Sequence, residues 1–236
     1  MNRHTLLFTG GLDSIISYYY LTSRLIDPVK LVYYKIGHRY QQAEIDSIYR
    51  FMDISKVDVD IRGDGPYLGG YEKEDGWIPA RNLFLSSLAS CFSDIIYLVV
   101  QKGEDCTEDR NGEFFLLVSY LLTKLHHRHI KLDPVFPLWT KQDMVKWYIG
   151  RGHDPMLLLN AYSCFSGDGP CSACPACFRK FISLEFSGLD TSLVIDKTKL
   201  FSWDGLRDYI TKLNSGYYDA VRTMQTKAVL HKYNIM

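Results

Sequence analysis

In the stretch Thr5-Leu6-Leu7-Phe8-Thr9-Gly10-Gly11-Leu12-Asp13-Ser14-Ile15-Ile16-Ser17-Tyr18, a short apolar run leads into two glycines and then into a helical pattern. The apolar run predicts a buried strand, and the glycines permit a sharp turn that a ligand can approach closely. Backbone N–H groups in such a turn, with the positive end of the following helix, form a site for anions. The stretch therefore predicts a strand–loop–helix unit that binds phosphate.

Side chains in this loop supply further ligands. Thr9 and Ser14 carry hydroxyl donors, and the Asp13 carboxylate suits a magnesium ion beside the phosphates. The loop lacks the Gly-Lys-Ser/Thr of a Walker loop and the Gly-x-Gly-x-x-Gly of dinucleotide-binding proteins. An ordinary capped turn between a strand and a helix is the alternative. We expect the phosphates of a nucleotide to bind at Thr9, Gly10, Gly11, Leu12, Asp13 and Ser14.

The composition is that of an α/β protein with a full hydrophobic core. The 236 residues fit one large domain, or one domain with an appendage. The 27 basic and 27 acidic side chains balance, so nothing points to a surface for nucleic acid or membrane. No apolar run approaches the length of a membrane span, and the N-terminus shows no signal-peptide pattern. We expect a cytoplasmic protein.

Strand patterns alternate with helix patterns along the chain. We expect strands at residues 6–8, 30–34, 56–61 and 94–100, and helices at 41–52, 81–92, 113–125 and 141–149. Residues 62–76 and 101–112 are polar loops, and 133–138 is an extended connector. Such alternation predicts a doubly wound parallel sheet covered on both faces, with ligands at the carboxyl ends of the strands.

Four cysteines crowd into one short segment: Cys164, Cys171, Cys174 and Cys177. Their spacing lets four thiolates meet one tetrahedral zinc ion, and a shell closed by four thiolates is structural rather than catalytic. Free thiols are the alternative. Of the other cysteines, Cys91 is expected to pack inside a buried helix. The basic run at residues 126–129 is expected to end a helix, where cations are favoured, rather than to bind a metal.

Several further stretches match one protein family in the same order along the chain. Besides Thr9 to Ser14, they are Arg39 with Glu44-Ile45-Asp46; Ile78-Pro79-Ala80-Arg81-Asn82-Leu83-Phe84-Leu85; Pro137-Leu138-Trp139 with Lys141; and Ser163-Cys164-Phe165 through Cys177-Phe178-Arg179-Lys180. Over roughly residues 5–186 the chain resembles the 7-cyano-7-deazaguanine synthase family of PP-loop ATP pyrophosphatases, as a divergent member. The resemblance implies a sheet of the PP-loop/adenine nucleotide alpha hydrolase-like type.

The resemblance also implies an ATP-dependent carbon–nitrogen ligase that uses ATP, Mg²⁺ and Zn²⁺. In the family, ATP adenylates the carboxylate of 7-carboxy-7-deazaguanine, ammonia attacks to give the amide, and a second adenylation dehydrates the amide to the nitrile. The product is the precursor of queuosine. Carried over from the family, Arg81 and Lys141 are the catalytic cations beside Asp13 and Ser14. Stacking on the base is expected from one or two of Tyr33, Tyr34, Tyr40, Trp77 and Trp139.

The chain departs from the family pattern in three places. The loop at residues 103–110 is shorter than its counterpart in the family. The gap between Cys164 and Cys171 is shorter than in the usual family pattern, and residues 187–236 have no counterpart in compact members. We therefore expect a synthase domain at 1–186, with the cysteine motif at 164–177, and a C-terminal helical extension at 187–236. Its helices are predicted at 203–213 and 217–233. The extension is a candidate surface for a protein partner, and a homodimer is left open.

These departures leave other functions open. A divergent relative could stop at the amide, or join the activated deazaguanine to another amine, such as a protein N-terminus in antiphage defence. A PP-loop thiolase acting on tRNA would need redox cysteines and a basic face, which the cysteine spacing and the charge balance do not favour. A zinc-stabilised nucleotide sensor would bind ATP without forming AMP.

Overall fold

A five-stranded parallel sheet forms the centre of the computed structural model, which describes residues 2–103 and 108–236. The strand order is β3-β2-β1-β4-β5. The bounds are β1 His4–Leu7, β2 Val29–Tyr34, β3 Asp60–Arg62, β4 Ile95–Val99 and β5 Lys131–Val135. In the register of the central strands, Leu6 lies between Leu31 of β2 and Tyr97 of β4. The doubly wound parallel sheet predicted from the alternation of strands and helices is therefore present.

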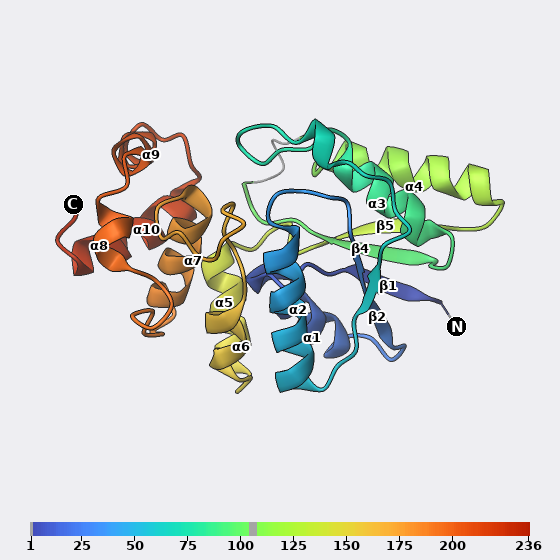
Figure 1. Ribbon diagram of the computed structural model, residues 1–236, viewed down its shortest axis with the longest axis horizontal. Coiled ribbons are helices and arrows are strands. Elements are labelled where there is room, and N and C mark those ends of the chain that lie inside the picture. The colour runs from blue at the N-terminus through green and yellow to red at the C-terminus, as the bar shows by residue number, and fades with distance from the viewer. Residues whose placement is uncertain (1, 104–107) are drawn as a thin grey trace.

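Helices cover both faces of this sheet (Figure 1). In the described residues the helices of the whole chain are α1 Leu12–Thr22, α2 Gln41–Ser55, α3 Arg81–Ser90, α4 Gly112–His126, α5 Lys141–Gly150, α6 Pro155–Asn160, α7 Pro175–Phe186, α8 Lys197–Phe201, α9 Gly205–Asn214 and α10 Ala220–Lys232, with a short 3₁₀ helix at Gly69–Tyr71. Helices α3 and α4 cover one face, whereas α1 and α2 cover the other. In the described part of the chain, no helix combines the length and apolarity needed to cross a membrane.

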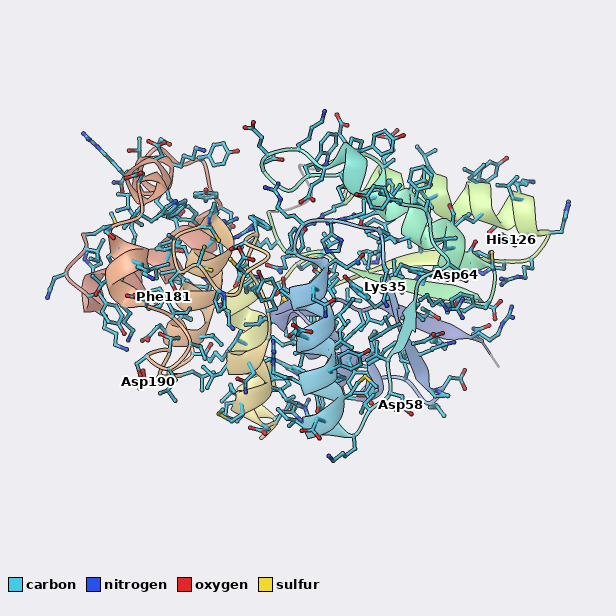
Figure 2. The ribbon with its side chains drawn as sticks, viewed as in Figure 1. Lys35, Asp58, Asp64, His126, Phe181 and Asp190 are labelled. Carbon is cyan, nitrogen blue, oxygen red and sulfur yellow. The ribbon has the colours of Figure 1, made fainter. Side chains whose placement is uncertain are left out.

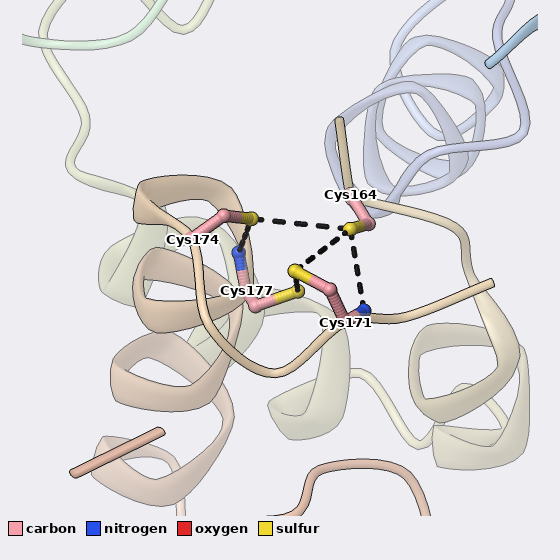
Figure 3. Close-up of side chains that lie close together, drawn as sticks. All are labelled: Cys164, Cys171, Cys174 and Cys177. Carbon is pink, nitrogen blue, oxygen red and sulfur yellow. Dashed lines mark hydrogen bonds between the residues drawn. The ribbon is translucent and has the colours of Figure 1, made fainter. Parts of the chain in front are cut away.

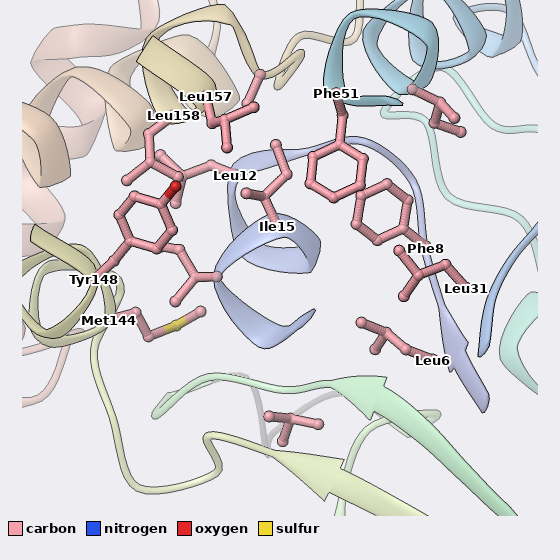
Figure 4. Close-up of a cluster of buried hydrophobic side chains, with 14 of the residues drawn as sticks. Leu6, Phe8, Leu12, Ile15, Leu31, Phe51, Met144, Tyr148, Leu157 and Leu158 are labelled. Atoms are coloured by element: carbon pink, nitrogen blue, oxygen red, sulfur yellow. The ribbon is translucent and has the colours of Figure 1, made fainter. Parts of the chain in front are cut away.

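Two hydrophobic cores lie on the two faces of the sheet, because successive strand residues point to opposite sides. Leu6 and Phe8 pack with Ile15 of α1 and Phe51 of α2 in the first core (Figure 4). Leu7 faces the other way, into a core that includes side chains of α4. The predicted strand–loop–helix unit is thus held on both faces, which fixes the loop between β1 and α1.

The structure corrects several expectations about the elements. Residues 133–138 were expected to be a connector, but Lys131–Val135 is an edge strand paired with β4. Its Pro134 lacks an N–H donor, which an edge position tolerates. A strand was expected at residues 56–61, but β3 covers only Asp60–Arg62. Lys56 is the left-handed C-cap of α2, and residues 57–59 connect it to the strand.

Two side-chain expectations have different outcomes. Cys91 was expected to pack inside a buried helix, but it is exposed, and it is the C-cap that follows the last residue of α3, Ser90. His126 ends α4, as expected for the basic run, and its imidazole Nε2 lies 2.8 Å from the Ser90 hydroxyl (Figure 2). Within residues 2–103 and 108–236, no potential metal-binding group includes His126, His127 or His129.

The C-terminal helices α8, α9 and α10 pack against α7 at one end of the molecule (Figure 1). Helices α9 and α10 correspond to the two helices expected there, and α8 precedes them. Phe181 of α7 is fully buried between them (Figure 2), with Leu200, Tyr209 and Leu230 in the same core. Residues 187–236 therefore have a hydrophobic core shared with α7.

Glu185, on the last turn of α7, holds three segments of the extension together. Its carboxylate accepts a hydrogen bond from Thr191 Oγ1 at 2.7 Å and pairs with Lys197 Nζ at 3.2 Å and Lys232 Nζ at 2.8 Å. Burial alone would raise the pKa of Glu185, but hydrogen bonds from Lys232, Tyr233, Thr191 and Lys197 outweigh it and lower the pKa to about 2. The buried Glu185 carboxyl group thus contributes to the stability of the fold through these contacts only while it is ionised.

We predict that Glu185→Gln lowers the stability of the folded chain by roughly 1–2 kcal/mol at pH 7, because it removes the buried carboxylate charge that the partly exposed Lys197 and the exposed Lys232 contact. A depressed carboxyl pKa adds stability above the unfolded value near 4.5, and this contribution is lost as the pH falls toward 2. The difference in melting temperature between wild type and variant should therefore shrink between pH 5 and pH 2. Asp53→Asn, at an exposed ion pair, is the control. Equal melting temperatures at pH 7 would contradict this role.

Candidate active site

A cavity of about 290 Å³ lies at the carboxyl ends of the central strands. Its walls include Phe8 and Thr9 after β1, Tyr33 and Tyr34 at the end of β2, and Gln101 after β4. The chain runs outward from β1 to β3 on one side and through β4 to β5 on the other, so the cavity lies where the strand order reverses. Open parallel sheets bind their ligands at such a point.

The loop between β1 and α1 contributes Thr9, Gly11, Leu12, Asp13 and Ser14 to this cavity, whereas Gly10 is not among its lining residues. Gly10 has φ +68°, and a Cβ at this position would lie 2.9 Å from the Ile48 backbone nitrogen. A glycine is thus required at position 10 for the loop to pack against α2.

Gly11 is the N-cap of α1 and brings no side chain. The first N–H groups of a helix lack partners within the helix, so α1 offers them at the cavity wall. Thr9 Oγ1 accepts a long 3.4 Å hydrogen bond from the Gly11 N–H, and Ser14 Oγ donates to the Gly11 carbonyl at 2.9 Å. The loop therefore has the features of a phosphate cradle, with the Ser14 hydroxyl proton already directed at the backbone.

Asp13 and Lys141 meet on the cavity wall although they are far apart in sequence. Lys141 Nζ donates to Asp13 Oδ2 at 2.7 Å, and Lys141 is the first residue of α5. The second oxygen, Asp13 Oδ1, is buried and has no hydrogen-bond partner within the described residues. A buried, unpartnered carboxylate oxygen beside a phosphate cradle fits the hard oxygen ligands that Mg²⁺ prefers. The residues present thus fit a nucleotide with its metal.

Two arginines line the same cavity from other elements. Arg81 begins α3, and its Nη1 lies 3.5 Å from the Tyr40 hydroxyl. Arg179 comes from α7, and its buried Nε has no partner in the part of the chain that the structure describes. The sequence match includes Arg179, but only the fold reveals that it reaches the cavity. Arg81 shares the cavity with the Asp13–Lys141 pair, and its hydrogen bond within the described residues is to Tyr40 rather than to that pair.

Glu44 organises a second polar group at the cavity. Its Oε2 accepts a hydrogen bond from the Tyr33 hydroxyl at 2.9 Å and lies 2.9 Å from His38 Nε2. Burial and the nearby Glu44 charge raise the pKa of Tyr33, so this phenol stays protonated and donates. His38 Nδ1 is buried and has no partner among the described residues. His38 was missed in the sequence, where its place shortly after a predicted strand was the available signal.

Of the aromatic candidates, Tyr33, Tyr34 and Tyr40 line the cavity, and the two tryptophans do not. Trp77 is half exposed, and Trp139 packs against Tyr20 and Phe136. These packing partners lie away from the cavity wall. Among the residues predicted to stack on a base, the three tyrosines are therefore the ones that line the cavity. Part of the loop expected at residues 103–110, including Cys106, lies outside the described residues.

The four clustered cysteines come together at the start of α7 (Figure 3). Their sulfur atoms all lie within 4.8 Å of one another. Backbone N–H groups of Ser166 and Cys171 donate to Cys164 Sγ at 3.3 and 3.4 Å. Thiol hydrogen bonds from Cys174 and Cys177 lower the pKa of Cys164 well below its ordinary value. A compact set of four sulfurs supported by N–H donors fits a structural zinc ion.

The cysteine cluster is adjacent to the cavity. Cys164 and Phe165 line the cavity wall, and Cys174 is the N-cap of α7. Lys180, further along α7, is buried and donates to the carbonyls of Leu159 and Ala161 at 2.7 and 2.6 Å. Burial lowers the pKa of Lys180 to about 8. The segment that leads into Cys164 is therefore anchored to the same helix that carries two of the cysteines.

Comparisons with known proteins agree on one family. The family model described as "Queuosine biosynthesis protein QueC" matches residues 68–186. A 7-cyano-7-deazaguanine synthase of Sulfolobus acidocaldarius is 24% identical over 79% of this chain and 46% of its own length. The 7-cyano-7-deazaguanine synthase 2 of Sulfurisphaera tokodaii is 23% identical, and the match covers 77% of this chain and 45% of that protein. The 7-cyano-7-deazaguanine synthase of Methanococcus maripaludis is 25% identical, and the match covers 78% of this chain and 94% of that protein. The chain thus spans about half the length of the first two relatives.

We predict about one zinc ion per chain in freshly purified protein, and its loss in Cys174→Ser. Because structural zinc binding is coupled to folding, this variant should also melt at a clearly lower temperature. Metal content is measured by inductively coupled plasma mass spectrometry, and stability by thermal melting. Cys91→Ser, at the exposed cysteine outside the cluster, should keep both the zinc and the melting temperature. Wild-type protein without zinc would refute the metal assignment.

Proposed function

We propose that this chain, which belongs to the QueC family of queuosine biosynthesis proteins, uses ATP to adenylate the carboxylate of 7-carboxy-7-deazaguanine. Ammonia then attacks the acyl adenylate and displaces AMP to give the amide. The amide oxygen is adenylated by a second ATP with release of pyrophosphate, and loss of AMP and a proton gives the nitrile. The relatives named 7-cyano-7-deazaguanine synthase support this product. The observation that carries the proposal is the contact between Asp13 and Lys141 at the phosphate cradle, on the wall of the cavity.

The substrate carboxylate is a poor electrophile, and the reaction with ammonia requires that it first carry a good leaving group, which adenylation supplies. Attack of the substrate carboxylate on the α-phosphorus of ATP forms the acyl adenylate and breaks the bond to pyrophosphate. The first N–H groups of α1 would hold the pyrophosphate oxygens, and Lys141 would stabilise the negative charge that develops there. Mg²⁺, held by Asp13 when bound, would supply further positive charge at the phosphates.

The opposite part of the cavity suits the base. Tyr33, Tyr34 and Tyr40 provide aromatic surface, and Glu44 with His38 provides a polar group among them. A deazaguanine presents N–H donors on the edge that carries its amino group, and a carboxylate is their natural acceptor. Arg81, beside Tyr40, would attract the substrate carboxylate and hold it near ATP. Each end of the cavity therefore has groups for one of the two substrates.

The zinc ion would act through structure. Four cysteine ligands leave no open position for a substrate or an activated water. By holding Cys164 and the start of α7 together, the ion would fix the wall from which Arg179 reaches the cavity. Its chemical contribution is thus the placement of protein groups.

We predict that Lys141→Met lowers the rate of AMP formation by roughly 100-fold, because charge on the departing pyrophosphate loses its nearest cation. The assay measures AMP released from ATP in the presence of 7-carboxy-7-deazaguanine and ammonium. Lys56→Met, which removes an exposed lysine outside the cavity, should behave as wild type. Melting temperatures of all three proteins verify folding. AMP formation at the wild-type rate by folded Lys141→Met protein would remove Lys141 from the mechanism.

We further predict that mass spectrometry of the same reaction detects 7-cyano-7-deazaguanine, with two AMP formed for each nitrile. One AMP per molecule and an amide product would instead indicate a ligase that stops after the first adenylation. Product seen only when a protein amine is supplied would indicate conjugation. ATP binding without any AMP would indicate a nucleotide sensor. The three alternative outcomes each exclude the nitrile synthase.

A further inference from the structure

Gln225 of α10 connects the C-terminal extension to the helix that carries Lys141. Its side chain is 4% exposed although it is a polar amide. The amide oxygen lies 2.9 Å from the Thr140 hydroxyl, and the amide nitrogen donates to Asp143 Oδ1 at 3.0 Å. One buried side chain thus supplies both an acceptor and a donor to the first turn of α5.

The two partners of Gln225 form the cap of α5. Thr140 is the N-cap, whose hydroxyl accepts a hydrogen bond from the Asp143 N–H, and the Asp143 carboxylate accepts one from the Thr140 N–H in return. Such a capping box fixes the first turn of a helix. Lys141 follows Thr140 directly and extends its ammonium group to Asp13. The backbone from which this side chain extends is therefore set by the cap that Gln225 supports.

A small cavity confirms that α10 faces this turn. Thr140 and Lys141 of the α5 turn and Thr226 of α10 all line a space of about 30 Å³. Arg179 lines both this space and the main cavity. The extension therefore forms part of the wall immediately behind the phosphate end of the site.

We propose that Gln225 is a positioning residue for Lys141, so that residues 187–236 complete the active site as well as covering α7. The proposal concerns the geometry of α5, and only its catalytic consequence rests on the proposed function. The Thr140 hydroxyl carries one proton, which the Gln225 amide oxygen shares with Asp143 Oδ2 at 2.7 Å. Without Gln225, the cap loses the hydrogen bond to Asp143 Oδ1 and the second acceptor of this proton, and the first turn of α5 can open. A small displacement of a catalytic group lowers the reaction rate strongly, because the group stabilises the transition state only from the correct position and orientation.

The test compares three variants on α10. Gln225→Met keeps the volume of the side chain and removes both hydrogen bonds. Val229→Ala creates a small defect in the core between α10 and α7 without touching the cap. Met224→Ala changes an exposed neighbour of Gln225. AMP formation, thermal melting and hydrogen exchange of the peptide spanning residues 138–146 are measured on the full-length proteins.

We predict that Gln225→Met lowers kcat for AMP formation by roughly 10- to 100-fold at a temperature where the protein is folded. Exchange of the first-turn amides of α5 should become roughly tenfold faster. Val229→Ala should lower the melting temperature but keep kcat and the α5 exchange rate, and Met224→Ala should change none of the three.

The two readouts separate the inference from the proposed function. If wild-type protein forms no AMP, the adenylation proposal fails, and the exchange of α5 still decides whether Gln225 holds the turn. Unchanged exchange in Gln225→Met would overturn the positioning role. Loss of activity in Gln225→Met and Val229→Ala in proportion to their melting temperatures would also overturn it, because that pattern reflects stability alone.

Discussion

The 2.7 Å contact between Lys141 and Asp13 is the interaction on which the arrangement of the site depends. The two residues are 128 positions apart, and each is near the start of a helix that follows a strand of the same sheet. Their meeting requires β1 and β5 to be correctly ordered, and it requires both helix starts to be fixed. A partly buried ion pair adds little net stability. In the proposed function, its value would be that it places a cation beside the loop at Thr9 to Ser14 and balances the local charge before a phosphate binds.

Features encoded by local spacing were predictable from the sequence. The loop at Thr9 to Ser14 follows from its glycines and its apolar flanks, and the cysteine cluster follows from short, regular gaps. The parallel sheet follows from alternation of strands and helices. In each case the interacting residues are close in sequence, or the pattern repeats often enough to exclude other periods.

Features that depend on distant partners were not predictable. Strand β5 contains Pro134 and becomes a strand through its pairing with β4. Arg179 reaches the cavity because of how α7 is placed, and no spacing in the sequence encodes that. For His38, the position after a predicted strand indicated the right edge of the sheet but not the contact with Glu44. Cys91 was misjudged because the end of α3, one residue earlier, depends on the local cap. The contact of Gln225 with the α5 cap joins residues more than 80 positions apart and needs the packing of α10.

Helix α7 carries three different duties within twelve residues. Its first turn holds Cys174 and Cys177, its middle directs Arg179 to the cavity and Lys180 to the Leu159 and Ala161 carbonyls, and its last turn presents Glu185 to the extension. Each added residue turns the remainder of a helix by about 100°. An insertion or deletion between Cys177 and Glu185 would therefore rotate at least one of these groups away from its partners. Length variation in this protein should consequently be confined to its loops, and α7 should accept substitutions but no change in length.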